Sequence, residues 1–252
     1  IMSKKIAEGI QGLVMDIKIG NGAFMNTIEE GKELATLIQD IAENFNIQSD
    51  IVFTSMNQPL GQFAGLWCEI KEAIDCLRDE GSNDTMKVTF ALGTKLLLQA
   101  QIVNDENEAL NLQQRLIESG SALEKLLEMV VIHDGSLSDL ASLHTLHLPE
   151  EETVLSAEKS GYITHMDTLR IGLAHCELGC GRKKVSDILD PTAGIEFYHK
   201  IGDEVSEGEP LMRLFNTKKD KLDTALHMLK KSVTIDDDKV QHHLILDDRN
   251  SS

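Results

Sequence analysis

Apolar and polar positions divide the first sixty residues into a strand, a helix and a second strand. The run LVMDIKI at residues 13–19 is dense in apolar and β-branched side chains and is flanked by glycines, which predicts a buried strand. Thr27 and Glu30 then form a capping box in front of apolar positions with helical spacing at residues 28–41. Another apolar run at residues 50–56 predicts the second strand. This order indicates an α/β fold with a mixed or parallel sheet covered by helices.

The hydrophobic spacing changes twice further along the chain. From about residue 66 to 131 it is helical throughout, which predicts a run of helices packed on the sheet. After residue 153 short strand-like stretches alternate with turns, with one helix around residues 221–233 and a last strand around 242–246. We therefore expect two domains, an α/β domain at residues 1–152 and a smaller α+β domain at residues 153–252.

The stretch GDEVSEGEPL, residues 202–211, has the pattern that biotinyl and lipoyl carrier domains use for a β-turn-β sandwich. Those carriers need an exposed lysine on a hairpin tip, and no such tip follows here. The pattern predicts a barrel-sandwich-like C-terminal domain without carrier chemistry.

Composition and charge narrow the classes of partner. Hydrophobic residues make up 41% of the chain and no apolar stretch approaches the ~20 residues that span a bilayer, so we expect no membrane partner. A formal net charge of -18, without a dense stripe of Lys or Arg, disfavours nucleic acid. Four cysteines without a recognisable secretory leader indicate reduced thiols in a cytoplasmic protein.

The segment GNGAFM at residues 20–25 lies between the first strand and the first helix, where a nucleotide-binding loop would lie. A dinucleotide fingerprint needs a third glycine three residues after the second, and Met25 occupies that position. The glycines at 20 and 22 are instead expected to let the chain turn tightly, and they need not hold a phosphate.

Three segments together resemble one family. They are IMSKKIAEG, then VMDIKIGNGAFM followed by MNQPLG, then GYITHMDTLRIGLAHCELGCGR followed by HKIGDEVSEGEPL. In order and spacing they resemble the pyrimidine-nucleoside and thymidine phosphorylases, over most of the 252 residues. The resemblance makes residues 1–152 the C-terminal part of the α/β domain that binds the pyrimidine.

The resemblance implies an enzyme that splits a pyrimidine nucleoside with phosphate, its co-substrate, into a free base and a pentose 1-phosphate. No other cofactor is required. Lys4 matches the lysine that hydrogen-bonds the pyrimidine carbonyl, and Phe24 matches the aromatic residue near C5 of the base. A cation at the carbonyl stabilises the negative charge that grows on the ring as the glycosidic bond breaks, which makes Lys4 an electrostatic catalyst.

The resemblance also implies a monovalent or calcium ion near the QPLG segment. Its ligands would be the backbone carbonyls of Leu60 and Phe63 and the carboxylate of Glu72, which is half a coordination shell. The full-length parent is expected to be a homodimer.

The family's phosphate-binding residues lie upstream of the segment that matches residue 1. We therefore expect this chain to be a fragment that has no phosphorolytic activity alone. The alternative is a stand-alone binding or regulatory protein that kept the fold and lost catalysis. A phosphoribosyltransferase of the same architecture is a third reading, which would need a diphosphate and magnesium site that the sequence does not show.

Overall fold

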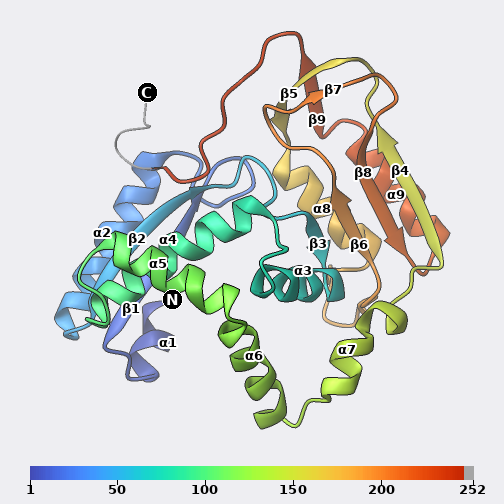
Figure 1. Ribbon diagram of the computed structural model, residues 1–252. Helices are drawn as coiled ribbons and strands as arrows, with labels where there is room; N and C mark the ends of the chain where they lie inside the picture. Colours follow the sequence, from blue (N-terminus) through green and yellow to red (C-terminus); the bar gives the residue numbers. More distant parts are fainter. Residues whose placement is uncertain (247–252) are drawn as a thin grey trace.

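The computed structural model describes residues 1–246, without the side chains of residues 143, 144 and 146 (Figure 1). Its first part begins with α1 (Met2–Ala7), β1 (Gly12–Ile19), α2 (Ile28–Asn44) and β2 (Gln48–Ser55). Strands β1 and β2 pair in parallel, with Gly12 opposite Gln48 and Ile19 opposite Ser55. The predicted strand, helix and strand are confirmed, and so is the capping box of Thr27 and Glu30.

Alternation along β1 explains how this sheet is covered. Leu13, Ile17 and Ile19 are buried in one core cluster with residues of α2. On the opposite face the helix α4 packs on both strands, and Gln99 at its end donates hydrogen bonds to the Leu13 carbonyl and to Asp50. The sheet is therefore covered by helices on both faces, as parallel strands require.

A run of helices follows β2 and leads to the C-terminal part. The elements are β3 (Phe63–Gly65), α3 (Trp67–Leu77), α4 (Asn83–Gln99), α5 (Glu106–Glu118), α6 (Ser121–Ile132) and α7 (Leu137–Leu146). The C-terminal part contains β4 (Glu151–Ser156), β5 (Gly161–Met166), α8 (Thr168–Leu178), β6 (Gly194–Phe197), β7 (Glu204–Val205), β8 (Pro210–Asn216), α9 (Lys219–Leu229) and β9 (Val233–Asp236).

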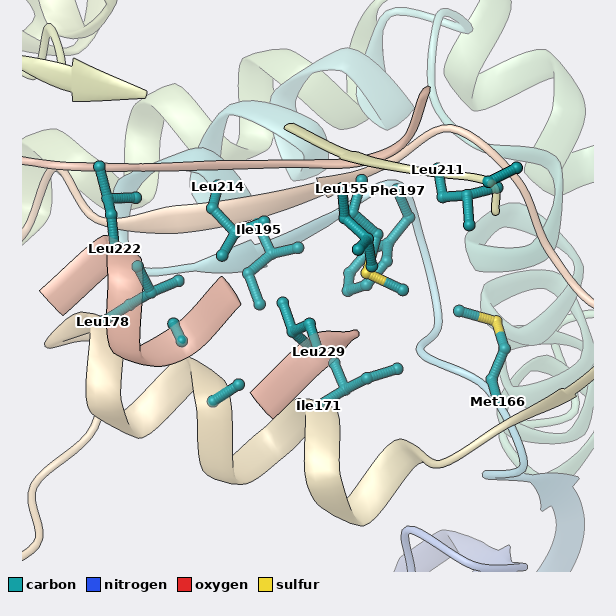
Figure 2. Close-up of a cluster of buried hydrophobic side chains, with 14 of the residues drawn as sticks. Leu155, Met166, Ile171, Leu178, Ile195, Phe197, Leu211, Leu214, Leu222 and Leu229 are labelled. Atoms are coloured by element: carbon teal, nitrogen blue, oxygen red, sulfur yellow. The ribbon is translucent and has the colours of Figure 1, made fainter. Parts of the chain in front are cut away.

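Two antiparallel sheets form the C-terminal part, with the orders β3-β6-β8-β4 and β7-β5-β9. Figure 2 shows its core, where Leu155, Ile195 and Leu214 from the four-stranded sheet lie over Ile171 and Leu178 of α8. Helix α9 adds Leu222 and Leu229 to the same cluster. A larger α/β part followed by a smaller α+β part is the fold class that the sequence predicts.

Several elements differ from the sequence-based expectation, and β9 is one that was not predicted. Helix α8 was expected to be part of a strand-and-turn region, and β3 was not expected at all. Around residues 242–246 the prediction of a strand was wrong, because this segment forms only an isolated bridge between Thr54 and Ile245. Ser55 N–H donates to Leu244 O and Leu246 N–H donates to Phe53 O, so the segment borders the end of β2.

Each part of the chain contributes a segment that packs with the other part. Strand β3 precedes α3 in the sequence but pairs with β6 of the C-terminal sheet. Residues 244–246 return from the C-terminal part to β2. Within the described part of the chain, no helix has the length and apolarity to cross a membrane.

Candidate functional site

The glycine loop, residues 20–25, is shaped by two close approaches. Gly20 has a φ of +129°, and a Cβ there would lie 2.4 Å from Oδ1 of Asn57. A Cβ on Gly22 would lie 2.6 Å from Cγ2 of Thr168 in α8. Neither position has room for a side chain, so both glycines are required by the packing of this loop.

Backbone hydrogen bonds close the loop and turn Phe24 outward. Gly20 N–H donates to Met25 O at 2.9 Å, and Ala23 N–H donates to Gly20 O at 3.0 Å. Phe24 is 97% exposed, at the edge of a surface groove of about 580 Å³ lined also by Met25 and residues of α2. An exposed aromatic side chain on a tight turn is available to contact a flat ligand.

Lys4 lies on α1 and is exposed. Met2 and Ile6, on the same helix, belong to the core cluster that also contains Met25. Lys4 and Phe24 therefore occupy different elements that are packed on one core. Their roles in binding a pyrimidine stay predictions.

The 58–63 loop, which follows β2 and ends in β3, carries the expected cation ligands Leu60 and Phe63. The carboxylate of Glu72 in α3 is buried beneath it, with 7% of the residue exposed. Oε1 accepts hydrogen bonds from Gln62 N–H at 2.8 Å and Ser82 Oγ at 2.6 Å, and Oε2 accepts one from Phe63 N–H at 3.0 Å. The structure brings the three predicted residues together, but Glu72 is engaged with donors of the protein.

A lysine from the C-terminal part supplies a positive charge to the same loop. Nζ of Lys200 donates to Pro59 O and Gly61 O at 2.5 Å each and lies 3.5 Å from Oδ2 of Asp84. Gly61 N–H donates to the same Asp84 oxygen at 3.0 Å. Burial lowers the pKa of Lys200, and Asp84 opposes that shift. The residues therefore fit a metal ion only in part, since one lone pair of Glu72 Oε2 and two carbonyls are an incomplete shell.

The side chain of Asn21 links the glycine loop to the C-terminal part. Its Nδ2 donates to Met166 O at 2.9 Å, and its Oδ1 accepts a hydrogen bond from Thr168 N–H at 2.7 Å. Neither Asn21 nor Lys200 was predicted as a site residue. Both make their contacts with residues about 140 positions away, and hydrophobic spacing carries no signal of such contacts.

Burial controls the titration of several side chains beside these loops. It lowers the pKa of His175 in α8 and raises the pKa of Glu69 in α3. It also raises the pKa of Cys68 to about 12 and that of Cys180 further still. All four cysteines are free, and thiols with raised pKa values are poor nucleophiles.

Comparisons with known proteins match both parts of the fold. Residues 1–123 match the model of the glycosyl transferase family a/b domain, and residues 162–236 match that of the pyrimidine nucleoside phosphorylase C-terminal domain. Pyrimidine-nucleoside phosphorylases from Staphylococcus aureus strains bovine RF122 / ET3-1 and USA300 are each 36% identical over 245 residues. Those residues are 97% of this chain and 56% of each relative, so the chain spans about half the length of the curated relatives it matches.

The two models match the two parts of the chain in the order in which the fold presents them, and the relatives align across both. The chain therefore belongs to the pyrimidine-nucleoside phosphorylase family.

Proposed function

We propose that this chain is the larger part of an enzyme that cleaves pyrimidine nucleosides, thymidine and also uridine or deoxyuridine, with phosphate. The observation that carries the proposal is its similarity to pyrimidine-nucleoside phosphorylases along 97% of its length. The exposed Phe24 on its glycine loop supports it, because its ring is available to contact a flat ligand.

In this mechanism the chain supplies two of the contacts to the base, from one side of the cleft. Lys4 Nζ donates a hydrogen bond to the pyrimidine carbonyl and stabilises the charge that develops as the glycosidic bond breaks. Phe24 packs against the ring and excludes water, which strengthens the electrostatic effect of Lys4. Phosphate is held by residues that, by resemblance, lie in the part of the relatives that this chain does not match.

We also propose the domain organisation, the location and the oligomeric state of the protein. The chain divides into an α/β part at residues 1–152 and a C-terminal part at residues 153–252, and the full-length protein is a cytoplasmic homodimer. Four free cysteines agree with a reducing compartment. A monovalent or calcium ion at Leu60, Phe63 and Glu72 would need further ligands from outside these three residues.

The test is an assay of phosphate-dependent release of thymine and uracil. We expect none from purified residues 1–252. We expect release once the chain is fused behind the part of a Staphylococcus aureus relative that it does not match. Activity of the chain alone would contradict the predicted dependence on the other part. A folded, inactive fusion would favour the alternative, a non-catalytic binding or regulatory protein.

A further inference from the structure

The loop that carries Phe24 is held both by its own backbone and by contacts with the rest of the molecule. Its base is closed by its own backbone, through the bonds of Gly20 and Ala23 and a bridge between Ile19 and Met25. At its tip, Gly22 N–H donates to Met56 O at 3.1 Å, beside the end of β2, and the side chain of Asn21 reaches the C-terminal part.

The nitrogen and the oxygen of the Asn21 side-chain amide both bind the short segment 166–168. Nδ2 donates to Met166 O, at the end of β5, and Oδ1 accepts from Thr168 N–H, at the start of α8. The residue between them, Asp167, is the N-cap of α8 and accepts from Arg170 N–H. The Asn21 amide therefore binds the connection between β5 and α8, and the N-cap of α8 already fixes the geometry of that connection.

Both sides of this contact are well packed. Met166 is 0% exposed and Thr168 is 7% exposed. Gly22 approaches Thr168 so closely that a side chain would not fit between them. A second asparagine, Asn57, accepts from Asn21 N–H at 3.0 Å and holds the tip from the side of β2.

We infer that Asn21 is a positioning residue, through which the C-terminal part sets the place of Phe24. Phe24 lies three residues further along the loop and is almost fully exposed, so its own side chain does little to anchor it. Its position depends on the backbone of residues 20–23, and Asn21 ties that backbone to Met166 and Thr168. As far as Phe24 contacts a pyrimidine, this inference rests on the proposed function.

The experiment compares Asn21→Ala with Asn26→Ala in the 1–252 chain. Asn26 lies beside the same loop and is exposed, so it is a matched control. Hydrogen–deuterium exchange is followed at residues 20–26 and at the first turn of α8. We expect Asn21→Ala to speed exchange at both places about tenfold, with β1 and β2 unchanged, and Asn26→Ala to leave both as in the wild type.

The position of Phe24 is read by fluorine NMR of the chain labelled with 4-fluorophenylalanine. Phe24→Leu identifies its signal among the seven phenylalanines. We expect Asn21→Ala to shift this signal, and Asn21→Asp, which keeps the acceptor for Thr168 N–H, to shift it less. An unchanged Phe24 signal, or unchanged exchange at both places, in Asn21→Ala overturns the inference.

Kinetics of the fused protein separate this inference from the proposed function. If the fusion is active, we expect Asn21→Ala to raise KM for the nucleoside about tenfold and to leave KM for phosphate unchanged, whereas a general loss of folding would affect both. Equal changes in both KM values overturn the positioning role. If the fusion is inactive, the proposed function fails, and the exchange and fluorine signals still decide whether Asn21 positions the loop.

Discussion

At the scale of single residues, Lys4 and Phe24 are two exposed side chains that little in this chain restrains. Exposure of this kind costs the folded state little and leaves both side chains free for a ligand. Changes at these positions should therefore leave the stability of the chain unaltered, and under the proposed function they should alter catalysis of the fused protein.

Lys4→Met gives the sharpest test at this scale. In the active fusion we expect kcat/KM to fall about 10²- to 10³-fold, because the charge on the departing pyrimidine loses its positive partner. The urea midpoint of the 1–252 chain should stay the same, since Lys4 is exposed. Steady-state kinetics and urea denaturation measure the two effects.

Lys5→Met is the matched control for that substitution. Lys5 is the next residue on α1 and pairs with Glu8 at 3.2 Å on the surface, a contact that contributes at most about 1 kcal/mol. Lys4→Arg should keep part of the activity because it keeps the charge. Equal losses in Lys4→Met and Lys5→Met would show that Lys4 has no special role.

At the scale of elements, the 58–63 loop shows how the fold orders an irregular segment. Glu72 and Asp84 accept from its N–H groups, while Lys200 donates to its carbonyls. Buried backbone groups need such partners, because an unpaired one costs as much as a lost hydrogen bond. The partners come from α3, α4 and the C-terminal part, so the loop forms only when all three are in place.

Gly61→Ala tests this packing. Gly61 has a φ of +76°, and a Cβ would lie 2.7 Å from both carboxylate oxygens of Glu72. We expect the free energy of unfolding to fall by about 2–4 kcal/mol, from backbone strain and displacement of the buried carboxylate. Urea denaturation measures it.

Gly208→Ala separates the strain from the displacement. Gly208 has a similar φ of +83°, but a Cβ there meets nothing within 4 Å. The free energy of unfolding should fall by about 1–2 kcal/mol, from backbone strain alone. If both substitutions cost the same, the contact with Glu72 contributes nothing.

The free energy of unfolding is expected to depend on pH through His175 in helix α8. Burial lowers the pKa of His175 below its ordinary 6.5, and within the described residues its Nε2 has no hydrogen-bond partner. As pH falls below 6.5, the unfolded chain takes up a proton that the folded chain does not. The stability is therefore complete above 6.5 and is lost as pH falls towards the folded pKa.

His175→Asn should flatten that dependence. Between pH 7.5 and 5.5 the free energy of unfolding of the wild type should fall, by at most about 1.4 kcal/mol per pH unit for each such histidine. In His175→Asn the free energy of unfolding should fall less with pH, because the contribution of this histidine is removed. His227→Asn, at an exposed position on α9, should keep the wild-type dependence on pH. Urea unfolding at each pH measures it, and an unchanged slope in His175→Asn would refute the assignment.

At the scale of the whole molecule, the net charge of -18 opposes compaction. Salt shortens the range of that repulsion from about 30 Å at 0.01 M to about 10 Å at 0.1 M. We expect the Tm to rise over this range, measured by differential scanning fluorimetry.

The same measurement tests the cation site when potassium chloride is compared with choline chloride at equal ionic strength. We expect equal rises in the Tm of the 1–252 chain, because Glu72 is already engaged by Gln62, Phe63 and Ser82. An ion here would need further ligands that the described residues do not place beside Glu72. A larger rise with potassium would show that the chain binds this ion specifically.

The sequence by itself determined the elements that depend on local signals. The strand, helix and strand at the start follow from hydrophobic spacing and a capping box. The glycine loop follows from two residues that allow a tight turn. The family follows from short segments in a fixed order, and these can be recognised without knowing the tertiary packing.

Only the tertiary structure decided how distant segments meet. Strand β3 joins the C-terminal sheet, Asn21 binds Met166 and Thr168, and Lys200 binds the 58–63 loop. A hydrogen bond between residues more than a hundred positions apart depends on the path of the whole chain, and no local period records it. For the same reason α8 was missed, because its buried face is defined by the sheet and by α9, against which it packs.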